Sequence, residues 1–184
     1  MKELILAFLD VETTGLDPQR HEVIQVGVVL AKQIERYGEK MGPMIEKIEE
    51  FEIKIKPERI ADAEEQALKI NGYNEGDWMF APDLKNAMEF LGKKLAGTIQ
   101  VSHNITFDSA FLEKSFERAG MENPMARYKL DTISIAFARL YNRPDVKYSL
   151  RYLCELFQIK NENAHTALAD AKALFELYKK MMNA

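Results

Sequence analysis

The sequence predicts an α/β fold that contains one antiparallel hairpin, and three observations support this class. Residues 4–9 are six consecutive apolar residues, a run that is typical of a strand buried on both faces. Two further strand patterns follow without a crossover helix between them, which favours antiparallel pairing. Apolar residues then repeat at helical spacing through most of the second half of the chain. We therefore expect residues 4–9 to form the central strand of the sheet.

The composition is that of a globular protein. The chain has 184 residues, of which 47% are hydrophobic and 29% charged, so we expect one domain over residues 1–184. The net charge of −4 offers no general attraction for nucleic acid, which would have to bind through local basic patches or metal ions. The single cysteine, Cys154, suits a reducing compartment, and the apolar runs are too short to span a membrane. We expect a cytoplasmic protein with no membrane contact.

The first half of the chain predicts a hairpin. Residues 21–30 read as a second strand, and residues 51–55 alternate between apolar and charged side chains until Pro57 stops them. The charged segment 32–50 between them carries a turn signal at residues 42–43, so we interpret it as a solvated extension of the hairpin. A role for this segment in binding a partner is also open.

The remaining elements follow from apolar spacing and from capping residues. We expect a short strand at 98–102, followed by a helix that has Asp108 in its first turn and that Gly120 ends. Ser149 is a good N-cap for the helix at 150–157. In the last helix, at 166–182, Asp170 interrupts the apolar face and therefore requires a partner. Three other helices are expected at 61–70, 84–95 and around 133–140.

Two carboxylates follow the first strand. Side chains at positions i and i+2 of a strand project from the same face, so Asp10 and Glu12 must lie side by side. The Thr13-Thr14-Gly15 turn comes next, which places both acids at the carboxyl end of the strand, where open α/β sheets bind ligands. Two adjacent like charges are costly unless a cation lies between them. The simplest interpretation is a divalent cation held by oxygen ligands.

The other polar residues have ordinary explanations when each is taken singly. Asp108 suits the start of a helix, and Asp131 suits a helix N-cap. His165 stands five residues before Asp170, yet a lone histidine is more often a surface residue than a catalyst. His103 can be interpreted as a structural, hydrogen-bonding residue.

Three segments together resemble a known family. Residues 10–16 (DVETTGL), 103–108 (HNITFD) and 165–171 (HTALADA) are similar, in this order, to the three motifs of the DEDDh 3′–5′ exonucleases. This DnaQ-like group includes the proofreading subunit of bacterial replicative polymerases. The resemblance extends to residues 70–72 and 131–132. It departs at Asn71, where the family usually has His, and at Tyr73, where it has Ile.

The resemblance implies a ribonuclease H-like fold, with a five-stranded mixed sheet and helices on both faces. It also implies that Asp10, Glu12, Asp108 and Asp170 hold two Mg²⁺ or Mn²⁺ ions, with His165 as the general base. This chemistry explains the residue types, because a phosphodiester is anionic, carboxylates suit hard cations, and histidine titrates near neutrality.

The resemblance further implies the substrate, a nucleic acid with a free 3′ end, most simply single-stranded DNA or RNA, cleaved to nucleoside 5′-monophosphates. Thr13, Leu16, His103 and Asn104 are the substrate-binding candidates. The alternative for Leu16 is that it anchors its turn in the core. A polymerase or another protein is a possible partner.

Other functions remain open at this point. The Asp-x-Glu-x-Thr pattern echoes the nucleophile loop of haloacid-dehalogenase-type phosphatases. Such enzymes also need a Gly-Asp-x-x-x-Asp pair, and Gly76-Asp77 is not followed by the second acid. An inactive binding module and a hydrolase of short oligoribonucleotides are two further alternatives. Five basic residues could follow a phosphate backbone or could simply be solvated: Lys129, Arg139, Arg143, Lys147 and Arg151.

Overall fold

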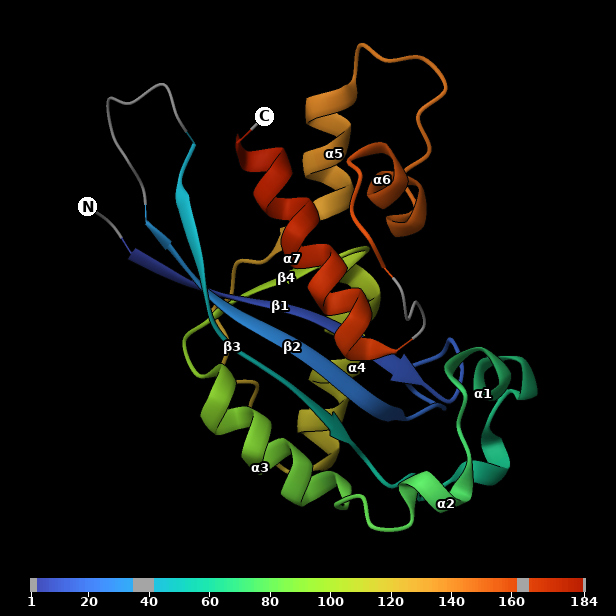
Figure 1. The fold of residues 1–184 in the computed structure, drawn as a ribbon. Helices are drawn as coiled ribbons and strands as arrows, with labels where there is room; N and C mark the ends of the chain where they lie inside the picture. Colours follow the sequence, from blue (N-terminus) through green and yellow to red (C-terminus); the bar gives the residue numbers. More distant parts are fainter. Residues whose placement is uncertain (1–2, 35–41, 162–165, 184) are drawn as a thin grey trace.

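The computed structural model describes residues 3–34, 42–161 and 166–183 (Figure 1). The helices and strands follow one another in this order: β1 (Glu3–Thr13), β2 (Val23–Ile34), β3 (Met44–Lys54), a 3-10 turn (Ile60–Asp62), α1 (Glu65–Asn71), α2 (Glu75–Trp78), α3 (Leu84–Leu95), β4 (Ile99–Ser102), α4 (Ile105–Arg118), β5 (Leu130–Asp131), α5 (Thr132–Leu140), α6 (Leu150–Leu156) and α7 (Ala167–Asn183).

The five strands form one mixed sheet in the order β3-β2-β1-β4-β5. The β1–β2 and β2–β3 pairs are antiparallel, whereas β4 pairs in parallel with both β1 and β5. Helices α3 and α4 lie on one face, and α7 lies on the other together with α5 and α6 (Figure 1). The predicted central strand, the antiparallel hairpin and the mixed sheet covered on both faces are confirmed.

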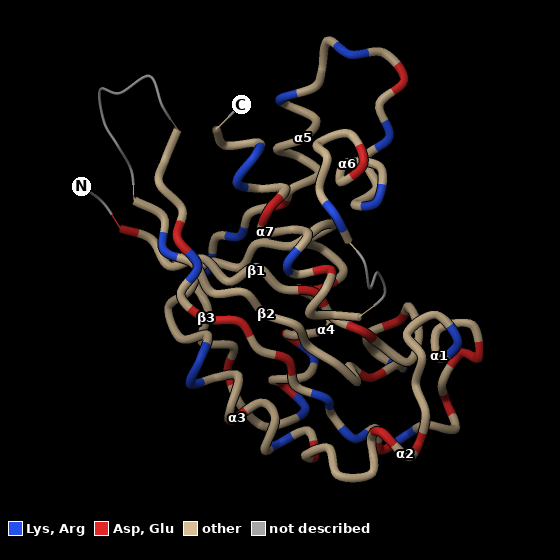
Figure 2. Tube along the Cα trace, viewed as in Figure 1, with Lys and Arg blue, Asp and Glu red and all other residues tan. Residues whose placement is uncertain are grey.

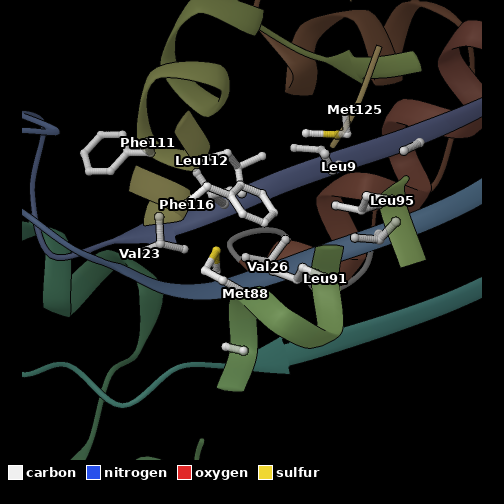
Figure 3. Close-up of a cluster of buried hydrophobic side chains, with 14 of the residues drawn as sticks. Leu9, Val23, Val26, Met88, Leu91, Leu95, Phe111, Leu112, Phe116 and Met125 are labelled. Carbon is white, nitrogen blue, oxygen red and sulfur yellow. The ribbon is translucent and has the colours of Figure 1, made fainter. Parts of the chain in front are cut away.

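The alternation of side chains along β1 decides which face carries the acids. Leu9 and Val11 belong to the core against α3 and α4, which Figure 3 shows around Leu91 and Phe116. Phe8 points the other way and meets α7, where its ring lies edge-on to Phe175 at 5.3 Å. Asp10 and Glu12 continue the series of Phe8, so both acids project toward the face that α7 covers.

The hairpin differs from the prediction at both of its strands. Strand β2 begins two residues later than expected, because His21 is held in a turn by its backbone N–H, which donates to the Asp17 carbonyl at 2.7 Å. Strand β3 begins seven residues earlier, at Met44, so segment 44–50 is part of the sheet. Its charges bind neighbouring helices: Glu49 pairs with Lys94 of α3 at 2.7 Å, and Glu50 with Lys172 of α7 at 2.5 Å. Segment 44–50 therefore extends the hairpin, as the sequence interpretation expected, and residues 46–48 are exposed, but Glu49 and Glu50 pair with lysines of α3 and α7 as well. Residues 35–41 lie outside the described residues.

The helix expected at 61–70 is also divided. A 3-10 turn at Ile60–Asp62 is separated from α1 by Ala63, which has an extended backbone with ψ 147°. The next residue, Glu64, donates its backbone N–H to the Thr14 carbonyl at 2.8 Å. A continuous helix could not make this contact, which joins the segment to the turn after β1.

The other helices and caps agree with the sequence. Asp108 lies in the first turn of α4, the Ser149 hydroxyl caps α6, and Asp131 caps α5. Gly120 follows α4 with a φ of 72°. Within the described part of the chain, the helices are too short or too polar to cross a membrane.

Candidate active site

Three carboxylates from two distant parts of the chain meet at one point. Asp10 and Glu12 come from the end of β1, and Asp170 comes from the first turn of α7. Each offers an oxygen, and these oxygens all lie within 4.8 Å of one another. The register of β1 against β2 shifts directly after Glu12, a bulge of the kind that is often found beside active sites. The sequence prediction that Asp10 and Glu12 share a face is confirmed.

Asp108 approaches the same strand from the other side. It is 3% exposed, and its Oδ1 accepts a hydrogen bond from the backbone N–H of Val11 at 3.1 Å. Val11 lies between Asp10 and Glu12 in β1, so Asp108 belongs to the same acidic region. It is not one of the three acids whose oxygens converge, and its side chain is partly occupied in joining α4 to β1.

The acids resist ionising together. Burial, followed by the charges of Asp108, Asp170 and Glu12, raises the pKa of Asp10 well above its ordinary value. Burial, Asp170 and Glu52 raise the pKa of Glu12 to about 7. For both acids, the causes that raise the pKa are burial and the negative charges of neighbouring described residues.

Burial also dominates at Asp108, where it raises the pKa to about 8 even though two backbone N–H groups stabilise the charged form. A cation held by the three converging acids would supply the missing positive charge. Carboxylate oxygens without thiolate are the donors that hard divalent cations prefer. The residues present therefore fit a metal centre, as the sequence predicts.

The turn that follows the acids is held on several sides. The Thr14 hydroxyl accepts the backbone N–H of Glu22 at 2.9 Å, and the Thr13 hydroxyl donates to the Gly15 carbonyl at 2.7 Å. Gly15 passes directly over the ring of His21, where any Cβ would collide with the ring atoms. The Nδ1 of that ring accepts the backbone N–H of Asp17 at 2.9 Å, so His21 has a structural, hydrogen-bonding role.

Asn71 braces this turn, and sequence reasoning missed it. Its side-chain amide donates to the Thr13 carbonyl at 2.9 Å, and its Oδ1 accepts the backbone N–H of Tyr73 at 3.2 Å. The only signal in the sequence was that Asn71 occupies a position where the resembled family usually has His. A polar residue at the end of a helix, just before a glycine, gave no other reason to connect it with residue 13.

Leu16 is 73% exposed. The alternative that it anchors the turn in the core was therefore wrong. The turn is fixed by the hydrogen bonds of Thr13 and Thr14, and it presents the Leu16 side chain to solvent. A large apolar side chain in this position is available to a ligand that reaches the acids.

His103 is engaged on both ring nitrogens. Its Nε2 donates to the Tyr148 carbonyl at 2.8 Å, and its Nδ1 lies within hydrogen-bond distance of the Thr132 hydroxyl, at 3.0 Å. Burial lowers the pKa of His103, although the Tyr148 contact and nearby acids oppose this shift. Its interpretation as a structural residue agrees with these contacts. Asn104 is exposed, with a φ of 70° at the start of α4. Substrate binding by His103 and Asn104 stays a prediction.

His165 lies outside the described residues. The residue just before the undescribed stretch, Asn161, donates its side-chain amide to Oδ1 of Asp170 at 2.6 Å. Asp170 thus has the hydrogen-bond partner that its place on an apolar helix face requires. Asn161 was not a sequence candidate, because nothing in the chain pattern connects a loop asparagine with a carboxylate nine residues later.

Two of the five basic candidates are paired with surface acids. Lys129 lies 3.1 Å from Glu113, and Arg151 lies 3.1 Å from Glu155. Basic residues do recur along α5, α6 and the segment that joins them (Figure 2). For Lys129 and Arg151, the solvated-surface interpretation has direct support.

Comparison with known proteins identifies one family. The RNase_T family model, described as Exonuclease, matches residues 7–178. The chain is 32% identical over 189 residues to the DNA polymerase III subunit epsilon of Rickettsia typhi, covering 97% of this chain and 74% of that protein. It is 30% identical to the PolC-type DNA polymerase III of Caldanaerobacter subterraneus, covering 94% of this chain and 11% of that protein. The chain thus spans about a tenth of the PolC-type relatives.

The fold matches solved structures at lower identity. The zinc-bound form of the E. coli ExoI–ssDNA complex superposes with a TM-score of 0.75 at 16% identity, over 97% of this chain and 40% of that one. This similarity agrees with the ribonuclease H-like fold that the sequence resemblance implied. The phosphatase alternative has no support, because the family that matches residues 7–178 is an exonuclease family.

Proposed function

We propose, since this chain belongs to the DEDDh exonuclease family, that it is a metal-dependent 3′–5′ exonuclease. The reaction is hydrolysis of the terminal phosphodiester bond of DNA or RNA at a free 3′ end, with release of a nucleoside 5′-monophosphate. The observation that carries the proposal is the convergence of Asp10, Glu12 and Asp170 within 4.8 Å. Asp170 is about 160 positions from Asp10 and Glu12 in the chain, and only the fold brings it to them.

The proposed cofactor is a pair of Mg²⁺ or Mn²⁺ ions. Asp10, Glu12 and Asp170 would hold them, with Asp108 completing the acidic set. When bound, such ions would neutralise the phosphate and stabilise both the attacking and the leaving oxygen. The chain itself keeps the acids at fixed positions: the Val11 backbone N–H holds Asp108, and the Asn161 amide holds Asp170.

The proposed general base is His165, which would take the proton from the attacking water. An imidazole suits this step because its ordinary pKa lies near neutrality. His103 is a poor substitute, because both of its ring nitrogens are already engaged with Thr132 and Tyr148. His165 is therefore the remaining histidine candidate, since the third histidine, His21, is buried beneath Gly15.

The proposed specificity for a 3′ end rests on the turn after β1. The turn is rigidly braced by Asn71 and presents the exposed Leu16 next to the acids, which supports packing of Leu16 against a terminal base. A backbone N–H near Thr13 would meet the 3′-hydroxyl. The E. coli ExoI structures in complex with single-stranded oligonucleotides support a single-stranded substrate.

The test uses three forms of one 5′-labelled single strand. We expect a descending ladder from the strand with a 3′-hydroxyl, slower digestion of the strand with a 3′-phosphate, and no cutting of a closed circle. Chromatography of the products should show nucleoside 5′-monophosphates. Efficient cutting of the circle would identify an endonuclease, and the absence of cutting in every arm with Mn²⁺ present would identify an inactive binding module.

A matched set of DNA and RNA oligonucleotides, single- and double-stranded, decides the preferred substrate in the same assay. Preference for RNA of a few nucleotides would support the alternative of a short-oligoribonucleotide hydrolase. A polymerase is the proposed protein partner, because the relatives include a polymerase subunit and a polymerase. A cytoplasmic location stays a prediction.

A further inference from the structure

Strand β2 carries two residues that support the first turn of α7. Gln25 pairs with Glu12 across the β1–β2 ladder, and Gly27 pairs with Asp10. Both β2 residues therefore lie on the same face of the sheet as the two acids, with Gln25 directly opposite Glu12 and Gly27 directly opposite Asp10. Helix α7 begins directly above them, at Ala167.

Gly27 allows the closest part of this contact. A Cβ at this position would lie well under 3.0 Å from the peptide that joins Ala167 to Leu168. The colliding atoms belong to the backbone, so no side-chain rotation could relieve the overlap. Any residue larger than glycine at position 27 must move the first turn of α7 away from the sheet.

Gln25 holds the same turn by a polar contact. Its side chain is 4% exposed, and its Oε1 accepts the backbone N–H of Ala167 at 3.4 Å. The first N–H groups of a helix have no partner within the helix, so a buried acceptor here fixes the position at which α7 can begin. Asp170 follows Ala167 by three residues and shares its rigid turn.

We propose that Gln25 and Gly27 are positioning residues that set the separation between Asp170 and the acids of β1. This inference rests on one part of the proposed function, namely that the acids of β1 and Asp170 hold the metal together. A Cβ at position 27 would lie 2.1 to 2.3 Å from backbone atoms of Ala167 and Leu168, so relief of the overlap requires a shift of about 1 Å. A functional constellation tolerates roughly 0.5 Å. A misplacement of about 1 Å can lower a rate by about 10²-fold.

The test compares Gly27→Ala with Val29→Ala. Val29 lies two residues further along β2 on the same face and is fully buried against α7 beside Phe175. Val29→Ala thus weakens the packing of the same helix without touching its first turn. Mn²⁺ affinity is measured by electron paramagnetic resonance on each variant without nucleic acid, and kcat and KM are measured separately on the 3′-hydroxyl strand.

We expect Gly27→Ala to bind Mn²⁺ at least about tenfold more weakly and to lose about 10²-fold in kcat, with KM changed by less than about threefold. Val29→Ala should lower the Tm yet keep Mn²⁺ affinity and kcat within about threefold of the parent. Parental Mn²⁺ affinity and kcat in Gly27→Ala would overturn the proposal. The proposal would also be overturned if both variants lost Mn²⁺ affinity and kcat in proportion to their loss of Tm.

A milder variant covers the case in which Gly27→Ala does not fold. Gln25→Met keeps the length of the side chain but removes the acceptor for the Ala167 N–H, and we expect a threefold to tenfold loss of Mn²⁺ affinity. Unchanged affinity in Gln25→Met would remove Gln25 from the proposal. A parent that binds Mn²⁺ but cuts no substrate would contradict the proposed function and leave the Mn²⁺ comparison as the test of the positioning residues.

Discussion

Asp108 and Asp131 occupy similar places in the chain but opposite environments. Each lies at the start of a helix that follows a parallel strand, Asp108 in α4 after β4 and Asp131 before α5 at the end of β5. Burial raises the pKa of Asp108 to about 8. At Asp131 burial acts in the same direction, but hydrogen bonds from Ser134, Ile105 and Ile133 outweigh it and lower the pKa.

The pKa values of the two aspartates differ because different groups surround their carboxylates. Asp131 receives the backbone N–H groups of Asn104 and Ile105 as well as those of its own helix, so it caps α4 and α5 together. Asp108 faces the acids of β1. The same residue type at a similar local position therefore stabilises the fold in one region and strains it in the other until a cation binds. Four experiments can break or sharpen this contrast.

The largest effect is expected for Asp10→Asn. Because Asp10 lies at the centre of the acidic region, its loss should abolish turnover in the oligonucleotide assay. The rise in Tm on adding Mn²⁺ should also shrink, since a ligand at about 100 times its dissociation constant adds roughly 2.7 kcal/mol. Asp83→Asn is the matched control, because Asp83 only caps α3 and asparagine caps equally well. A full Mn²⁺ effect in Asp10→Asn would place the metal elsewhere.

His165→Ala should have the next largest effect. General-base catalysis contributes about 10²- to 10⁴-fold, so kcat should fall by that factor while KM changes little. The kcat of the parent should rise with pH through a histidine-like ionisation that the variant lacks. Turnover near that of the parent in His165→Ala would remove this residue from the mechanism.

The pH dependence of stability without metal should have opposite signs in the two regions. Burial raises the pKa of Glu12 from 4.5 to about 7, so the folded state binds this proton more tightly than the unfolded chain. The stability gained from the protonated form is complete below pH 4.5 and is lost as the pH rises through 7, by on the order of 3 kcal/mol. Asp131, with its lowered pKa, stabilises the fold at pH values above 3.8, and this contribution is lost as the pH falls.

The measurement is Tm against pH in the presence of a chelator, for the parent and for Glu12→Gln. The variant should gain stability over the parent as the pH rises from 5 to 8. A difference that is constant across this range would show that Glu12 titrates normally. The contrast with Asp131 would then be wrong at this residue.

The smallest effect is expected for Asp131→Ala. Loss of a helix cap typically costs about 1 kcal/mol, so the Tm should fall by a few degrees. The destabilisation should disappear in acid, where the parental carboxylate is protonated as well. A loss of turnover as complete as that of Asp10→Asn, at an unchanged Tm, would instead place Asp131 in the reaction.

Local patterns in the sequence were sufficient for much of the fold and for part of the site. The apolar run at 4–9 predicted the central strand, because a strand buried on both faces needs no polar alternation. The two-residue period placed Asp10 and Glu12 together, and the caps at Asp131 and Ser149 agreed with the observed helix starts. The family resemblance added Asp108, Asp170 and His165 by their order along the chain.

The tertiary structure decided what depends on contacts between distant residues. Segment 44–50 is a strand because it pairs with residues 29–34 of β2, and no local pattern specified this register or the ion pairs with α3 and α7. The exposure of Leu16 follows from the hydrogen bonds that fix Thr13 and Thr14, one of which comes from Asn71. The close packing of α7 on Gly27 likewise depends on two backbone segments that are about 140 residues apart in the chain. Neither segment specifies this contact alone.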